Sequence, residues 1–323
     1  MFLLLSREDY YVTSATRRVL FRVMAENRTP VVLSGVTKRF GTTTAVDSLS
    51  WAPRRGQVTA LVGLNGAGKS TTMRVMTGLI KPTEGSVKVA AGDGERALSA
   101  MIETPGLFTG MSVRRNLDIH RVLTGAPAAQ IDEIAELVQV QDVMGKRVGT
   151  LSQGYRQRVA IGVALLGSPA VLLLDEPTNA LDPDAILQLR QLIRRVAERD
   201  TAVVVSTHQL RELEGTADAL TLIHDGQVLY DGPFDDFVGS PSLRIRAMDD
   251  AATGGLAAAL EAEGIRADRT PDALRVTTDG SADLLATQIF DIAAQSGVKL
   301  VELSHVTPTL EEAFHAAISG ASS

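Results

Sequence analysis

The segment Gly63-Leu64-Asn65-Gly66-Ala67-Gly68-Lys69-Ser70 constrains the fold of this chain more than any other part of the sequence. It follows an apolar run, Val58–Val62, that is typical of a strand buried on both faces of a sheet. It precedes a helix-like stretch over Thr71–Ile80. Strand, glycine-rich loop and helix together form the phosphate-binding loop pattern. The alternative is a glycine-rich turn in an unrelated sheet protein, which would not need the strand before it and the helix after it.

The chemistry of this loop explains its residue types. Glycines let backbone N–H groups close around phosphates, and the N-terminus of the following helix favours negative charge. Lys69 is expected to reach the terminal phosphates, and the Ser70 hydroxyl is expected to bind Mg²⁺. The sequence therefore predicts a site for a nucleoside triphosphate with Mg²⁺.

A second apolar run, Val171–Leu174, ends in the carboxylate pair Asp175-Glu176. The run predicts another central parallel strand, and ligands bind at the carboxyl ends of such strands. We expect Asp175 to belong to the Mg²⁺ shell and Glu176 to act as a general base toward the attacking water. An acidic pair after a strand is commonly only a solvated turn, but the phosphate loop upstream favours the catalytic interpretation.

Composition excludes several other classes of protein. The 323 residues are 45% hydrophobic and 22% charged, which is ordinary for a globular chain of one or two domains. Without cysteine, thiol catalysis and thiolate metal sites are ruled out. The net charge of −6 lies entirely in residues 241–323, so no basic region for nucleic acid is expected. The uncharged run Val159–Leu174 is interrupted by Gly167-Ser168-Pro169 and predicts no membrane span.

Four regions follow from the changes in pattern along the chain. Residues 1–29 are an N-terminal extension, interpreted either as sequence upstream of a true start at Met24 or as a disordered or weakly helical arm. Residues 30–240 alternate strands and helices, as an α/β domain does. Residues 241–318 predict a small α+β domain with a ferredoxin-like fold, because their elements follow a β-α-β-β-α-β order with a closing helix. The expected elements are a strand at Leu243–Ala247, a helix at Leu256–Glu263, strands at Ile265–Asp268 and Leu274–Thr277, a helix at Ala282–Ser296, a strand at Leu300–Leu303 and the closing helix Thr309–Ile318. Residues 319–323 are a tail.

Four further features give the α/β region a family resemblance. Leu151-Ser152-Gln153-Gly154-Tyr155-Arg156-Gln157-Arg158 resembles the signature motif of ATP-binding-cassette (ABC) ATPases. Pro177–Asp182 is similar to the segment that ends in the dimer-contact loop of that family, and His208 matches its switch histidine. Phe40 matches the aromatic residue that stacks on adenine, with a position in the core as the alternative interpretation. The resemblance covers about Val31 to Gly232.

The resemblance implies a phosphate-loop ABC nucleotide-binding domain with a helical subdomain, and a site for ATP and Mg²⁺. It implies catalytic roles for Glu176 and His208, metal ligation by Ser70, Glu103 and Asp175, and a dimer contact at Asp182. The ATP-binding residues that it implies are Phe40, Gly63, Asn65, Gly66, Ala67, Gly68, Lys69, Ser70, Thr71, Ser152, Gln153 and Gly154. In the family, two such domains sandwich two ATP molecules, so that the signature motif of one completes the site of the other.

Several positions depart from the common family pattern: Gln153, Tyr155 and Leu64 are frequent variants, and Glu103 bears on the metal site. Glu103 stands where most ABC ATPases have a glutamine that binds Mg²⁺, and a carboxylate remains able to bind the metal. Glu103 followed by Pro105-Gly106-Leu107-Phe108 resembles the bacitracin-resistance and lantibiotic self-protection subgroup. We expect the site to be active, with a charged metal ligand at Glu103 in place of the neutral glutamine that is common in the family.

The function implied by the resemblance is that of an ATPase subunit that energises a separate membrane permease, for export of a drug, antibiotic, peptide or lipid. The implied partners are a second ABC ATPase, identical or paired, and the permease, which would hold the chain at the cytoplasmic face of the membrane. The alternative is an ABC ATPase with a mechanical or regulatory role and no transport. Such proteins commonly have two cassettes or a long coiled-coil insertion, and neither is visible here. The small C-terminal domain carries no catalytic constellation, and we expect it to regulate or stabilise a dimer.

Overall fold

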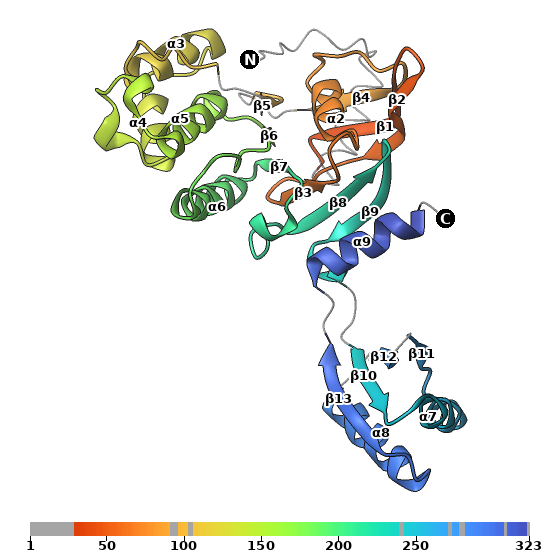
Figure 1. Cartoon of the computed structure of the whole chain (residues 1–323). Coiled ribbons are helices and arrows are strands. Elements are labelled where there is room, and N and C mark those ends of the chain that lie inside the picture. Colours follow the sequence, from red (N-terminus) through yellow and green to blue (C-terminus); the bar gives the residue numbers. More distant parts are fainter. Residues whose placement is uncertain are drawn as a thin grey trace. The chain divides into compact units, whose positions relative to one another are not determined.

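The computed structural model describes residues 29–90, 96–102, 106–238, 242–270, 273–277, 282–306 and 309–321. The chain divides into two compact units, one that ends at Phe234 and one that spans Asp235–Ser323. The division falls a few residues before the boundary at residue 240 that the sequence suggests. Each unit is described by itself below (Figure 1).

The first unit is organised around a six-stranded sheet in the order β5-β6-β7-β3-β8-β9. Its strands are β3 (Val58–Val62), β5 (Ser99–Met101), β6 (Val171–Asp175), β7 (Ala202–Thr207), β8 (Ala219–His224) and β9 (Gln227–Pro233). The first five pair in parallel, and β9 is antiparallel to β8. β3 and β7 are buried at every residue, because helices or a second sheet cover both faces.

A second sheet, antiparallel and ordered β2-β1-β4, lies on the side of the first where α2 is placed (Figure 1). Its strands are β1 (Val31–Phe40), β2 (Thr43–Trp51) and β4 (Glu84–Val89). The helix α2 (Lys69–Met76) contributes Met73 and Met76 to one core, which also holds Leu33 of β1 and Leu173 of β6. The start of α2, and hence the phosphate loop, is thereby held between two sheets.

The stretch between β5 and β6 is helical, as the sequence predicts. It contains α3 (Val113–Thr124), α4 (Gln130–Leu137) and α5 (Gln153–Leu165), with short 3-10 turns at Gln141–Val143 and Val148–Thr150. These helices gather on one side of the unit (Figure 1). Ser152 caps the N-terminus of α5, where its hydroxyl accepts from the Tyr155 N–H. The segment that resembles the signature motif is therefore the first turn of a helix.

Helix α6 (Pro183–Ala197) follows the carboxylate pair and covers the central strands β3 and β7. Leu189, Ile193 and Val196 form its buried stripe, at the helical spacing expected from the sequence. Asp182 caps the helix by accepting from the Ala185 N–H at 2.8 Å, and Pro183 occupies the first turn, where a missing N–H costs nothing.

The second unit is built on a four-stranded sheet in the order β11-β12-β10-β13. After the 3-10 turn η4 (Asp235–Val238), its elements are β10 (Ser242–Ala247), α7 (Asp250–Ala262), β11 (Asp268–Arg269), β12 (Leu274–Thr277), α8 (Ala282–Gln295), β13 (Leu300–Val306) and α9 (Leu310–Ala321). All neighbouring strands are antiparallel. The β-α-β-β-α-β order is the expected one, and the ferredoxin-like fold of this unit stays a prediction.

Several predicted bounds were wrong for local reasons. α2 ends at Met76 and not at Ile80, because Gly78 has a φ of 71° and closes the last turn. α7 begins at Asp250 and not at Leu256, because Asp249 caps it by accepting from the Ala252 N–H. β11 lies at Asp268–Arg269, at the end of the predicted strand Ile265–Asp268.

Candidate active site

The phosphate loop connects β3 to α2 and depends on its glycines. Gly66 and Gly68 have φ angles of 86° and 108°, which favour glycine. A Cβ on Gly68 would also collide with the Ala45 carbonyl oxygen, and one on Gly63 with the Ile223 carbonyl oxygen. No side chain caps α2, and its first turn has no acidic residue. The N-terminus of α2 is thus left to receive an anion.

Lys69 is the first residue of α2, and its side chain is only 6% exposed. Its ammonium donates to the carbonyl oxygens of Gly63 at 2.8 Å and Leu64 at 3.2 Å, within its own loop. It also lies 3.8 Å from Glu176 Oε1. Burial lowers the pKa of Lys69, while the carboxylates of Glu176 and Asp175 oppose that shift. The positive charge of Lys69 is therefore turned toward the loop, where phosphates would lie.

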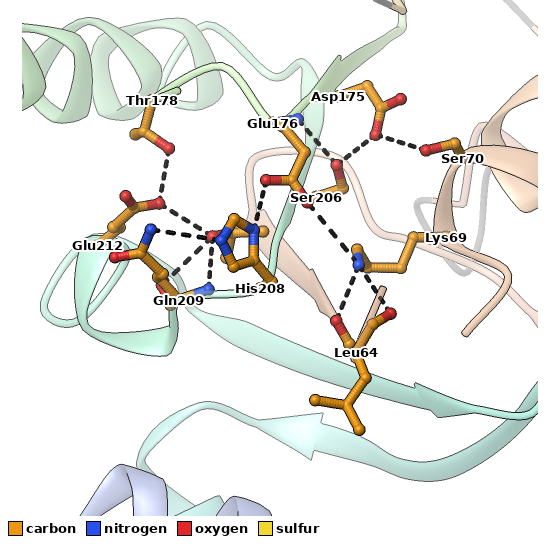
Figure 2. Close-up of polar contacts among 12 residues, drawn as sticks. Leu64, Lys69, Ser70, Asp175, Glu176, Thr178, Ser206, His208, Gln209 and Glu212 are labelled. Atoms are coloured by element: carbon orange, nitrogen blue, oxygen red, sulfur yellow. Dashed lines mark hydrogen bonds and ion pairs between the residues drawn. The ribbon is translucent and has the colours of Figure 1, made fainter. Parts of the chain in front are cut away.

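Asp175 ends β6 beside the loop. Its Oδ1 accepts from the Ser70 hydroxyl at 3.2 Å and from the Ser206 hydroxyl at 2.6 Å (Figure 2). These hard oxygen donors suit Mg²⁺, which commonly takes only one or two protein ligands and completes its shell with phosphate and water. Among the described residues, no group of three or more His, Asp or Glu side chains is arranged to hold a metal ion by itself. Glu103, the third expected ligand, lies outside the described residues.

Glu176 adopts a left-handed backbone conformation, with a φ of 47°. Its N–H donates to both the carbonyl oxygen and the hydroxyl of Ser206, at 3.2 and 2.9 Å, which holds this unusual conformation in place. Its carboxylate lies between Lys69 and His208, whose Nδ1 is 2.7 Å from Glu176 Oε2 (Figure 2). With an ionised Glu176, Nδ1 carries the proton of this contact.

Three residues that support this site were missed by the sequence interpretation. Ser206 joins Asp175 to Glu176, as described above. The Glu212 carboxylate accepts hydrogen bonds from the hydroxyls of Thr178 and Thr207. The buried side chain of Gln157, in α5, donates a hydrogen bond to the Pro177 carbonyl oxygen at 2.8 Å. The only sequence signal was the proximity of Ser206 and Thr207 to His208, and of Gln157 to the signature segment.

Ser152, Gln153 and Gly154 of the signature segment take no part in the site contacts described above, whereas Gln157 does. Ser152 and Gln153 are exposed, and Gly154 is half-buried. A Cβ on Gly154 would lie 3.0 Å from the Ala185 Cβ of α6, a tight contact. Asp182, which caps α6, is also exposed. Within the described ranges, the hydrogen bonds and the ion pair of Lys69 go to Gly63, Leu64 and Glu176, and to none of these residues.

Phe40 ends β1 with 49% of its surface exposed, so that the interpretation as a core residue is wrong. Its ring is covered on one side by the Lys38 ammonium, 4.9 Å from the centroid. Thr71, in the first turn of α2, is half-buried. An exposed aromatic ring is available for stacking on a base.

A strand, a glycine loop closed on a lysine, and a carboxylate pair at the end of a neighbouring parallel strand define the class of phosphate-loop nucleotide-binding domains. A family model described as "ABC transporter" matches residues 46–179. A second model, described as "AAA domain, putative AbiEii toxin, Type IV TA system", matches residues 147–214.

The chain is similar to a bacitracin transport ATP-binding protein of Bacillus licheniformis, with 38% identity over 219 residues that cover 64% of this chain and 71% of that protein. A lantibiotic transport ATP-binding protein of Streptococcus pyogenes is 31% identical, over 63% of this chain and 90% of its own length. An sn-glycerol-3-phosphate import ATP-binding protein of Rhizobium johnstonii is 33% identical, over 75% of this chain and 77% of its own length. The chain belongs to the ATP-binding proteins of the ABC transporter family and is an ATPase.

The fold agrees with that membership. A solved ATP-binding cassette of an ABC transporter, MJ1267 in its ADP conformation, matches with a TM-score of 0.59 and 23% identity. The match covers 65% of this chain and 94% of the solved one. Within the described ranges, no helix combines the length and apolar character that a membrane crossing requires.

Proposed function

We propose that this chain hydrolyses ATP to energise a separate membrane permease that exports an antibiotic, peptide or related compound. The observation that carries the ATPase part is the convergence of Lys69, Asp175, Glu176 and His208 at the carboxyl ends of β3, β6 and β7. The names of the bacitracin and lantibiotic relatives support export. The import relative is less identical than the bacitracin one, and it makes direction the point to test.

Each side chain has a role in the proposed reaction. Lys69 and the first turn of α2 bind the phosphates of ATP, and Phe40 stacks on the adenine. Ser70 and Asp175 hold Mg²⁺, which neutralises charge on the phosphates when bound. Glu176 accepts a proton from the attacking water, and His208 fixes the orientation of the Glu176 carboxylate through Nδ1.

The remaining site residues support a reaction between two copies. Ser152 and Gly154 lie at the N-terminus of α5, exposed or half-buried, and away from the Lys69 of their own chain. A helix N-terminus that faces outward suits the γ-phosphate of ATP held by another ABC ATPase. Asp182, also exposed, is proposed as a dimer contact. We propose a homodimer or a pair with a related ATPase, attached to the membrane through the permease.

The assigned cargo is tested by deleting the gene in the organism that carries it. We expect greater sensitivity to bacitracin or a lantibiotic, with resistance restored by the natural chain and not by Glu176→Gln. Loss of uptake of a nutrient, with unchanged antibiotic sensitivity, would overturn export. An unchanged phenotype together with ATP hydrolysis by a chain that co-purifies with no membrane protein would favour a mechanical or regulatory role.

A further inference from the structure

Glu212 is a half-buried carboxylate in the 3-10 turn η3 (Leu210–Glu212), on the far side of the site from the phosphate loop. Its Oε2 accepts two hydroxyl hydrogen bonds, from Thr178 Oγ1 at 2.6 Å and from Thr207 Oγ1 at 2.9 Å (Figure 2). Both threonines are almost completely buried. Hydrogen bonds to a carboxylate are stronger than those between neutral groups. The Glu212 carboxylate therefore holds both threonine side chains in position.

The two threonines belong to the two segments that carry the proposed catalytic pair. Thr178 follows Glu176 by two residues, and Thr207 directly precedes His208. The Thr207 hydroxyl also accepts from the Gln209 N–H at 2.9 Å, so the residues on both sides of His208 are fixed through that hydroxyl. The Glu176–His208 contact of 2.7 Å therefore joins two segments that Glu212 joins a second time, through Thr178 and Thr207.

We infer that Glu212 is a positioning residue for ATP hydrolysis, which sets the distance and orientation between Glu176 and His208. Glu212 acts through its hydrogen bonds from Thr178 and Thr207. The inference rests on the proposed roles of Glu176 and His208. It goes beyond those roles, because it assigns to a side chain outside the phosphate loop and the carboxylate pair the alignment on which general-base catalysis depends.

The test compares steady-state ATP hydrolysis by the full chain and by two Glu212 variants. Glu212→Ala removes the anchor, and we expect kcat to fall about tenfold while KM for ATP stays within about twofold, since phosphate binding is untouched. Glu212→Gln keeps an oxygen that accepts both hydroxyls, and we expect it to restore most of kcat. Glu214→Ala, at an exposed position two residues on, is the matched control.

A second comparison separates positioning from general loss of structure. In a His208→Ala background the contact that Glu212 aligns no longer exists, so Glu212→Ala should cost less than about twofold in kcat there. Thr207→Val, which removes only the hydroxyl, should reproduce the Glu212→Ala effect even if Glu212→Ala itself folds poorly. An equal loss in both backgrounds, or kcat unchanged in Glu212→Ala and Thr207→Val, would overturn the inference.

A different result, the activity of the Glu176→Gln variant, tests the proposed function. If Glu176→Gln hydrolyses ATP as the natural chain does, the catalytic role of Glu176 is wrong, whatever Glu212 does. If Glu176→Gln is inactive and the Glu212 variants are fully active, the proposed function stands and only the positioning role is rejected.

Discussion

Two glycines of the phosphate loop, Gly66 and Gly68, share a positive φ but differ in the space around them. A Cβ on Gly66 would meet no heavy atom within 4 Å, whereas one on Gly68 would collide with the Ala45 carbonyl oxygen of β2. The first position needs glycine for its backbone conformation alone. The second needs it also because the second sheet lies against the loop.

This difference predicts unequal costs for the two alanine variants. Gly66→Ala should lower the free energy of unfolding by about 1–2 kcal/mol, the cost of a left-handed backbone for alanine. Gly68→Ala should cost more and should also weaken ATP binding, because either β2 or the loop must move. Denaturant unfolding and equilibrium nucleotide binding measure both effects, with Gly110→Ala, at an exposed and open position, as the control. Equal costs at the two positions would contradict the assigned close approach.

The sequence identified the residues whose role is local. Lys69, Ser70, Asp175 and Glu176 lie in contiguous motifs, and the structure brings them together as expected. Glu212, Ser206 and Gln157 could not be identified in the same way. Apart from Thr207, which is five residues from Glu212, their partners are 20 to 34 residues distant along the chain. Only the packing of β6, β7 and α5 brings these distant residues into contact.

Among the secondary-structure elements, the central strands were predicted well because burial on both faces leaves a continuous apolar run. The antiparallel pair β1 and β2 was not placed as a second sheet by the sequence, since its pairing is interrupted by three register shifts that hide a regular alternation. The start of α7 was missed for another reason. Its Gly254-Gly255 pair weakens the helical signal, which Asp249 restores by capping.

Helix α3 carries a buried histidine, His120, whose ring lies 6.1 Å from that of Phe108. Burial lowers the pKa of His120 below its ordinary value of 6.5, and the charge of Arg96 lowers it further, against a backbone hydrogen bond at Gly106. The unfolded chain therefore binds this proton more readily than the folded one. The stabilising contribution is complete above pH 6.5 and is lost as the pH falls below it.

This linkage predicts that His120→Gln reduces the pH dependence of stability. The natural chain should lose more of its melting temperature between about pH 7.5 and about pH 5.5 than the variant does. Thermal unfolding at the two pH values measures the difference, and His315→Gln, at an exposed histidine of α9, should leave it unchanged. A variant with the same pH dependence as the natural chain would exclude His120 as the titrating group.

For the whole molecule, the two units have separate cores. Leu173 of β6 belongs to the core of the first unit, and Leu260 of α7 belongs to the core of the second, which is lined by β10, β12 and α8. Both side chains are fully buried. Truncating either one to alanine should cost about 2–5 kcal/mol in its own unit.

We therefore predict two calorimetric unfolding transitions that respond to different variants. Leu260→Ala should lower one transition and leave nucleotide binding unchanged, while Leu173→Ala should lower the other and weaken nucleotide binding. A single transition that both variants lower equally would contradict independent folding of the units.

The most direct test of the account is Mg²⁺-dependent ATP hydrolysis by the full chain over a range of protein concentrations, beside Glu176→Gln. We predict that the rate per chain rises with concentration, as our proposal that a second copy completes the site requires. In Glu176→Gln the rate should fall by about 10²–10⁴-fold, the usual contribution of a general base, while ATP binding persists. Hydrolysis by Glu176→Gln at the rate of the natural chain would contradict the central claim.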